Sequence, residues 1–189
     1  MNENKAFRIL FILIFLLTFS ACSIKPPQVD NMIPVTYTPS PATIQKVLEV
    51  TKVSGKRIEN ILENDADTRE IFRRAVVTTL ENKKLFNKIE RVDLELADYE
   101  LSITILDIRI NITGGIGKGR FETRLFVSYK LIQIQTNKII WQKNILNEHY
   151  THKSKHGANT IVVGFEGAAK ENISKFITQL EEDLNSLQL

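Results

Sequence analysis

The sequence YELSITILDIRINIT occupies residues 99–113 and alternates apolar and polar side chains, with one change of phase. Up to Ile105 the odd-numbered residues are apolar, and from Ile108 onward the even-numbered residues are apolar. Successive side chains of a strand point to opposite faces, so a slip of one residue keeps the apolar set on one face only through a β-bulge. This stretch therefore predicts a long strand with a bulge near Ile105 and Leu106.

The neighbouring segments predict the rest of a sheet. Residues 121–131 resume the alternation after a glycine-rich loop, and residues 138–150 return after a turn at Thr136 and Asn137. Residues 46–53 and 88–92 predict two further short strands. Hairpin-like connections of this kind favour an antiparallel sheet.

Two stretches have the apolar spacing of amphipathic helices. The first covers residues 66–83 and directs charged side chains such as Arg73 toward water, and the second covers residues 165–187. Because Gly164 and Gly167 lie near its expected start, the sequence does not determine which residue begins the second helix. The apolar stripes are Ile71, Phe72, Ala75, Val76, Thr79 and Leu80 in the first helix, and Ala169, Ile173, Phe176, Ile177, Leu180, Leu184 and Leu187 in the second. The expected fold is α+β, with a curled antiparallel sheet of four to five strands and two helices on one of its faces.

The first 22 residues have the composition of a secretory signal. Lys5 and Arg8 lie in a short polar segment, residues 9–19 are almost unbroken Ile, Leu and Phe, and two small residues precede Cys22, the only cysteine. The apolar run is shorter than the about 20 residues that a membrane-spanning helix needs. A basic segment, an apolar core and a small-residue cleavage site together predict export.

The residues Phe19-Ser20-Ala21-Cys22 resemble the lipobox of bacterial lipoproteins, although Phe19 stands where an aliphatic residue is usual. The resemblance implies a signal peptide over residues 1–21, and fatty acylation (palmitate or a similar chain) of Cys22. In these lipoproteins, an Asp directly after the acylated cysteine is associated with retention in the inner membrane. The resemblance therefore implies that Ser23 directs the protein to the outer membrane, with its domain in the periplasm. The alternative is an ordinary signal or membrane anchor with an incidental cysteine.

All five prolines lie between Pro26 and Pro41, among Ser, Thr, Asn and Asp residues. Such a composition predicts an extended linker over residues 22–44 rather than a core element, followed by a folded domain over residues 45–189. At about 3.1 Å per residue the linker would extend roughly 70 Å from the membrane. The alternative is that residues 32–37 pair as an edge strand, which would shorten the free segment.

The three histidines, His149, His152 and His156, are the only cluster of metal-ligand type. Spacings of three and four do not place side chains on one face of a strand, whose period is two. We therefore expect no metal site, and no motif indicates a cofactor. The glycine-rich loop, residues 114–119, lacks the Ser or Thr and the following helix of a phosphate-binding loop.

Neither composition nor motifs favour catalysis or nucleic-acid binding. The net charge is only +3, and the basic residues are dispersed. Trp141 is expected in the core, and the consecutive acids Glu181, Glu182 and Asp183 are expected to form a solvated patch. No nucleophile is spaced with a base in a known catalytic pattern.

A further set of residues lies within an order of strand, helix, strands and long terminal helix. These residues are Ala97-Asp98-Tyr99-Glu100-Leu101, Tyr129-Lys130-Leu131, Thr136-Asn137-Lys138, Trp141, and Ala168-Ala169 with Ile173, Phe176 and Ile177. Together they resemble small envelope lipoproteins of the YajG and ABC-transport-auxiliary types. The lipopolysaccharide-assembly lipoprotein LptE has a similar layout and is the alternative. The resemblance to these families implies no catalytic residue.

The sequence thus predicts a non-enzymatic outer-membrane lipoprotein that is an accessory or docking subunit of an envelope complex. Its partners would be the membrane, through Cys22, and another envelope protein. A second hypothesis is a lipid-binding auxiliary subunit of an ABC-type transport system, with an acyl chain in an apolar cleft between helix and sheet. A third, less supported, is a hydrolase of envelope polymers.

Overall fold

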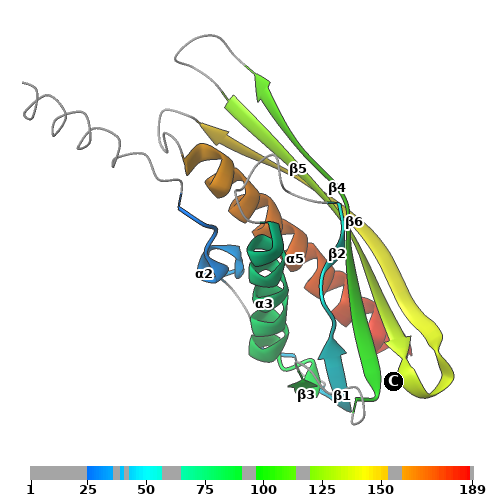
Figure 1. Cartoon of the computed structure of the whole chain (residues 1–189). Helices are drawn as coiled ribbons and strands as arrows, with labels where there is room; N and C mark the ends of the chain where they lie inside the picture. Colours follow the sequence, from blue (N-terminus) through cyan, green and yellow to red (C-terminus); the bar gives the residue numbers. More distant parts are fainter. Residues whose placement is uncertain are drawn as a thin grey trace, which may run out of the picture.

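The computed structural model describes residues 25–35, 39–40, 43–56, 65–90, 97–113, 120–152 and 159–187. Within them the chain forms one sheet with its helices on one side (Figure 1). The helices are α2 (Val29–Met32), α3 (Asp65–Lys83) and α5 (Thr160–Leu187), with a 3-10 turn η2 (Ile134–Thr136). The strands are β1 (Ile44–Val50), β2 (Ser54–Gly55), β3 (Phe86–Glu90), β4 (Tyr99–Thr113), β5 (Arg120–Gln133) and β6 (Lys138–His152).

The fold class is α+β, as predicted, but the sheet is mixed and has six strands. Its order is β3-β1-β4-β5-β6, and β2 pairs with β4 beside β1. The β4, β5 and β6 strands are antiparallel, whereas β1 runs parallel to both β3 and β4. The expectation of a purely antiparallel sheet of four to five strands is therefore wrong in this part. The reason is that α3 joins β1 to β3, and a helical crossover returns the chain in the same direction.

The long strand and its bulge are confirmed. The pairing of β4 with β5 shifts between Ile105 and Asp107, so Leu106 is the extra residue. Ile103 and Ile105 are fully buried before the shift, and Ile108 packs against the same core after it. The bulge thus keeps the apolar side chains on the face that the helices cover.

The core lies between this face and the helices. Phe176 of α5 stacks on Tyr129 of β5 with ring centroids 4.1 Å apart, and Trp141 of β6 lies 5.9 Å from Phe176. Trp141 is therefore a core residue, as expected. The predicted stripes of both helices are buried wherever their side chains are described, except that Ile71 is only partly buried.

Arg73 departs from the prediction that it faces water, since only 9% of it is exposed. Its guanidinium donates to Oε1 and Oε2 of Glu70 at 2.8 Å and to the backbone oxygen of Val50 at 3.3 Å. The hydrogen bond from Arg73 to Glu70 stabilises the charged guanidinium and raises the pKa of Arg73. A long side chain can lie along the apolar surface with its charged end paired, which periodicity alone does not reveal.

Helix α5 begins at Thr160, five residues earlier than predicted, and contains both Gly164 and Gly167. A Cβ atom at Gly164 would lie 2.6 Å from Oγ1 of Thr123, and one at Gly167 would overlap the imidazole ring of His149. The two glycines therefore allow this end of α5 to approach the sheet closely. They do not mark a helix end.

The proline-rich segment also departs from the prediction that it is not a core element. Met32 is completely buried and belongs to the main apolar core, and Pro27 and Pro34 are buried as well. Part of this segment forms α2, which packs against α3 and α5 (Figure 1). We call residues 25–35 the strap. The expected edge strand over residues 32–37 is not seen in its described part, because α2 ends at Met32 and residues 33–35 are not in a strand.

Several predicted features lie outside the described residues. These are the signal peptide, Cys22, the glycine-rich loop and His156. None of the described helices combines the length and the apolar composition required to cross a bilayer.

Candidate functional site

The outer face of β4, β5 and β6 points away from the helices and is the most distinctive surface of the domain. At its middle, Phe126 and Leu146 lie opposite each other in the pairing of β5 with β6. Leu146 is 50% exposed, which is unusual for a large apolar side chain. The two residues line a shallow pocket of about 190 Å³ together with Asp107, Arg109 and Arg124.

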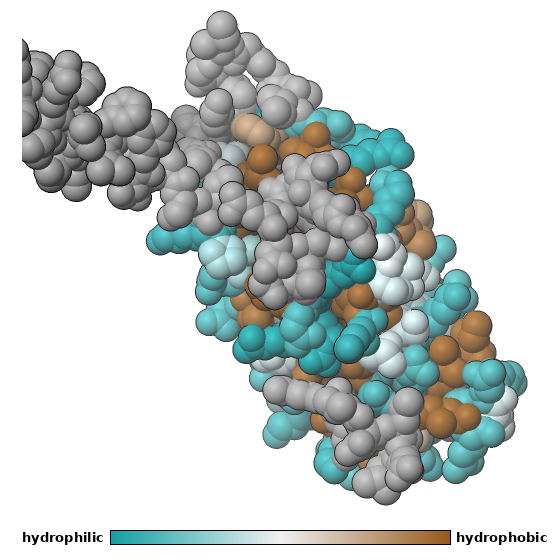
Figure 2. All heavy atoms as spheres, viewed as in Figure 1, coloured by the Kyte–Doolittle hydropathy of each residue, from teal (hydrophilic) through white to brown (hydrophobic). Residues whose placement is uncertain are grey.

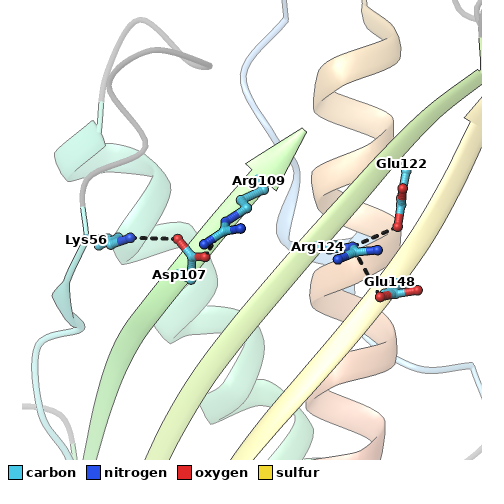
Figure 3. A network of polar contacts seen from close by, with 6 residues as sticks. All are labelled: Lys56, Asp107, Arg109, Glu122, Arg124 and Glu148. Atoms are coloured by element: carbon cyan, nitrogen blue, oxygen red, sulfur yellow. Dashed lines mark hydrogen bonds and ion pairs between the residues drawn. The ribbon is translucent and has the colours of Figure 1, made fainter. Parts of the chain in front are cut away.

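Charged residues near this apolar centre form two groups, one made by Lys56 with two residues of β4 and one that crosses from β5 to β6 (Figure 3). Asp107 accepts from Lys56 at 2.8 Å and from Arg109 at 2.6 Å. Arg124 bridges two carboxylates, Glu122 at 2.7 Å and Glu148 at 3.1 Å. The bond from Lys56 lowers the pKa of Asp107, with help from the Arg109 charge, and the bond from Arg124 lowers the pKa of Glu122. These two carboxylates are therefore charged at neutral pH.

The six charged groups, three cations and three anions, balance one another. Ion pairs at a protein surface contribute little to stability, because solvent screens the charges. Their fixed order does, however, give the face a defined electrostatic pattern.

Strand β6 ends the sheet on this side. Its first residues carry a second exposed apolar side chain, Ile139, which is 48% exposed and pairs with Ile132 of β5. In Figure 2, hydrophobic residues gather at the end of the molecule where β6 begins. The outer face thus has two apolar areas, one around Leu146 and one around Ile139, separated by polar residues along β6 such as Gln142 and Asn144.

Near the end of β6, the inner side of the strand meets α5 through a polar contact. Nδ1 of His149 lies 2.9 Å from Oε1 of Glu171, and the Nε2 side of its ring lies against Gly167. The side chain of His152 is not among the described groups. Within the described part of the chain, no three His, Cys, Asp or Glu side chains are arranged to hold a metal ion.

The acidic run at the end of α5 is not simply a solvated patch. Oδ2 of Asp183 accepts from Nε1 of Trp141 at 2.8 Å and from Lys143 at 3.1 Å, and Glu181 pairs with Lys83 at 2.7 Å. The bond from Trp141, followed by that from Lys143, lowers the pKa of Asp183. Glu182 is exposed, as expected, whereas Glu181 and Asp183 are only partly exposed and are paired.

The lipid-binding hypothesis requires an apolar cleft between helix and sheet, but side chains fill the interface between the middle of α5 and the sheet. There Asn172 is fully buried, accepts from the Tyr129 hydroxyl at 2.7 Å and donates to the backbone oxygen of Ile145 at 2.9 Å. Phe176 fills the adjacent space on Tyr129. Burial raises the pKa of Tyr129 well above its ordinary value, so its hydroxyl keeps its proton for this bond.

The strap is held by one carboxylate. Glu166 of α5 is 6% exposed, and its two oxygens accept from the backbone N–H of Gln28 at 2.7 Å and from Nδ2 of Asn31 at 2.9 Å. At the start of the strap, the backbone N–H of Lys25 donates to Oδ1 of Asn159 at 3.1 Å.

Sequence reasoning did not single out Leu146, Phe126 or Glu166. Leu146 and Phe126 could have been found from alternation, because both occupy positions that the period of two assigns to the polar face. Glu166 had no such signal, because its partners lie more than 130 residues away along the chain.

No protein-family model matches the sequence, and no curated protein matches it. Among solved structures, protein XCC0632 from Xanthomonas campestris, of the family DUF330, is similar with a TM-score of 0.63 and 16% identity, over 88% of this chain and 99% of that chain. The protein CT253 from Chlamydia trachomatis has a TM-score of 0.51 and 10% identity, over 72% of this chain and 96% of that one. A minor lipoprotein from Acinetobacter baumannii follows with a TM-score of 0.47 and 11% identity, over 73% and 94% of the two chains.

At these identities the first two likenesses show a shared fold and nothing about activity. The specific YajG-type relationship predicted from the sequence is not confirmed. What the comparisons support is that the described domain has the α+β fold of the DUF330 protein from Xanthomonas campestris.

Proposed function

We propose that the protein is an outer-membrane lipoprotein whose domain lies in the periplasm and is a non-enzymatic docking subunit of an envelope complex. The signal-like residues before Cys22 support the location, since an acylated cysteine would anchor the domain to a membrane. The observation that carries the docking role is the uncovered outer face, where Leu146 and Phe126 lie among fixed charge pairs.

This face has the composition of a protein interface. Such interfaces combine an apolar centre with a polar rim, and arginine is enriched in them. Leu146 and Phe126 supply the centre, and Arg109 and Arg124 belong to the rim. The opposite face of the sheet is covered by α3 and α5, so the outer face is the side of the sheet that a partner can approach.

The anchor is tested by mass analysis of the protein purified from the envelope. The expected N-terminus is Cys22 with a diacylglyceryl group on its sulfur and an acylated amino group. An intact leader, or an unmodified Cys22, would refute the anchor. A Cys22→Ala variant is the control and should accumulate without lipid.

The docking role is tested by photocrosslinking in intact cells. A photoreactive residue at Asn144, on the outer face beside Leu146, should give a defined adduct with one envelope protein. The adduct should disappear with Leu146→Asp, a surface change that leaves the core intact. The matched control is a photoreactive residue at Thr178, which is exposed on α5. Equal adducts at Asn144 and Thr178, or an adduct that survives Leu146→Asp, would contradict docking through this face.

A further inference from the structure

The strap begins only three residues after the cysteine of the proposed anchor. Three residues span at most about 11 Å, because an extended chain advances about 3.3–3.6 Å per residue. Lys25, the first described residue, is bonded to Asn159, immediately before α5. The point where the chain leaves the membrane would therefore lie close to the start of α5.

The contacts that follow hold the strap firmly in place. Glu166 binds the strap at two points, Gln28 and Asn31, and is itself almost fully buried. Met32 then inserts into the main core with no exposed surface. The buried methionine side chain and the two hydrogen bonds to the Glu166 carboxylate both stabilise the docked strap.

Several other chain segments end beside the start of α5. Arg120 at the start of β5 pairs with Thr113 at the end of β4 and with His152 at the end of β6. We call this the anchor end. The far end holds the turn after β5, where Gln133 pairs with Lys138. Since β5 has 14 residues at about 3.3 Å each, the two ends are separated by roughly 45 Å.

Resting on the proposed lipid anchor, we infer that the strap docks the domain directly on the membrane, with the anchor end facing the lipid surface and the far end pointing away. The linker predicted from the sequence does not extend roughly 70 Å. It folds back onto α3 and α5, so the domain has one orientation. The area around Ile139 then lies at the end most distant from the bilayer. The area around Leu146 lies between the two ends and faces along the membrane plane.

The test uses the full, lipidated chain in vesicles of phosphatidylethanolamine and phosphatidylglycerol that contain acceptor-labelled lipid. Two variants, Arg120→Cys and Lys138→Cys, place a donor dye at exposed positions of the anchor end and the far end. The acylated Cys22 sulfur cannot react with the dye. Energy transfer to the lipid should be strong from residue 120 and several-fold weaker from residue 138.

A strap-release variant gives the second measurement. Glu166→Ala combined with Met32→Ala removes the two hydrogen bonds to Glu166 and the fully buried methionine side chain, which weakens the hold on the strap. The difference in transfer between the two dyes should then shrink. Glu171→Ala is the matched control, because it alters the same helix without touching the strap, and it should keep the difference.

When the strap is unaltered, equal energy transfer from residues 120 and 138, or stronger transfer from residue 138, would overturn the docked orientation alone. A chain that does not float with the vesicles would instead remove the lipid anchor, and with it the proposed location and this orientation together. Co-flotation therefore separates the two failures.

Discussion

The two halves of α5 meet the same sheet by different means. In the first half, Gly164 and Gly167 allow close approach to Thr123 and His149, and His149 makes a polar contact with Glu171. This half also buries apolar side chains such as Phe165 in the core. In the second half, residues such as Phe176 bury large apolar side chains against β5 and β6. Asn172, bonded to Tyr129, lies at the boundary.

The difference separates stability from positioning. Burial of apolar area is the main source of folding free energy, so loss of the aromatic contacts of the second half should cost the most stability. The first half also buries Phe165, but it carries in addition Glu166, which accepts two hydrogen bonds from the strap and, in the proposed orientation, fixes the domain relative to its anchor.

The largest expected effect is in the apolar half. Phe176→Ala removes the ring that stacks on Tyr129 and contacts Trp141, and should lower the free energy of unfolding by about 3–5 kcal/mol. Chemical denaturation followed by circular dichroism measures this loss. Thr178→Ala, a change at an exposed position of the same helix two residues away, should have little effect. A loss below about 1 kcal/mol for Phe176→Ala would remove the contrast between the halves.

An intermediate effect on stability is expected in the first half of α5, where the helix approaches the sheet closely. Gly167→Ala places a methyl group where the His149 ring lies and should destabilise by about 1–3 kcal/mol. In a His149→Ala background the clash is gone, and the same change should stabilise by up to about 1 kcal/mol, because Ala is the better helix former. Thermal denaturation of the four proteins gives the double-mutant cycle. The same sign in both backgrounds would show that close approach is not the reason for this glycine.

The smallest effect on stability is expected near the end of α5, at Asp183. Asp183→Asn keeps an acceptor for Trp141 but removes the charge that pairs with Lys143, and should cost less than about 1 kcal/mol at pH 7, since the carboxylate is partly exposed to solvent.

This loss should depend on pH in a defined direction. The pKa of Asp183 is lower in the folded state than its ordinary value of 3.8, so its contribution is present above that pH and disappears as the pH falls through the folded-state pKa. Denaturation curves from neutral pH down through that pKa should therefore show the wild type and Asp183→Asn converging at the acid end. A difference that grows on acidification would contradict the charged pairing.

Periodicity predicted the elements that depend on local pattern. The bounds of β4, the bulge after Ile105, the helix α3 and the apolar stripe of α5 all follow from alternation or 3–4 spacing, because these record which side chains face the core. The parallel pairing of β1 was missed, although the strand-helix-strand order around α3 was present in the sequence. The buried Arg73 was missed because its acceptor on Val50 lies on another element.

The sequence by itself determined the α+β class, the bulged central strand, the two long helices and a single cysteine preceded by a signal-like segment. The tertiary structure alone decided that the proline-rich strap belongs to the core, that two helix glycines serve close packing, and that Leu146 lies in an exposed pocket. Local patterns record the side of an element that is buried. Contacts such as those of Glu166 with Gln28 and Asn31 join residues far apart in the chain, and only the folded arrangement of the elements brings them within hydrogen-bonding distance.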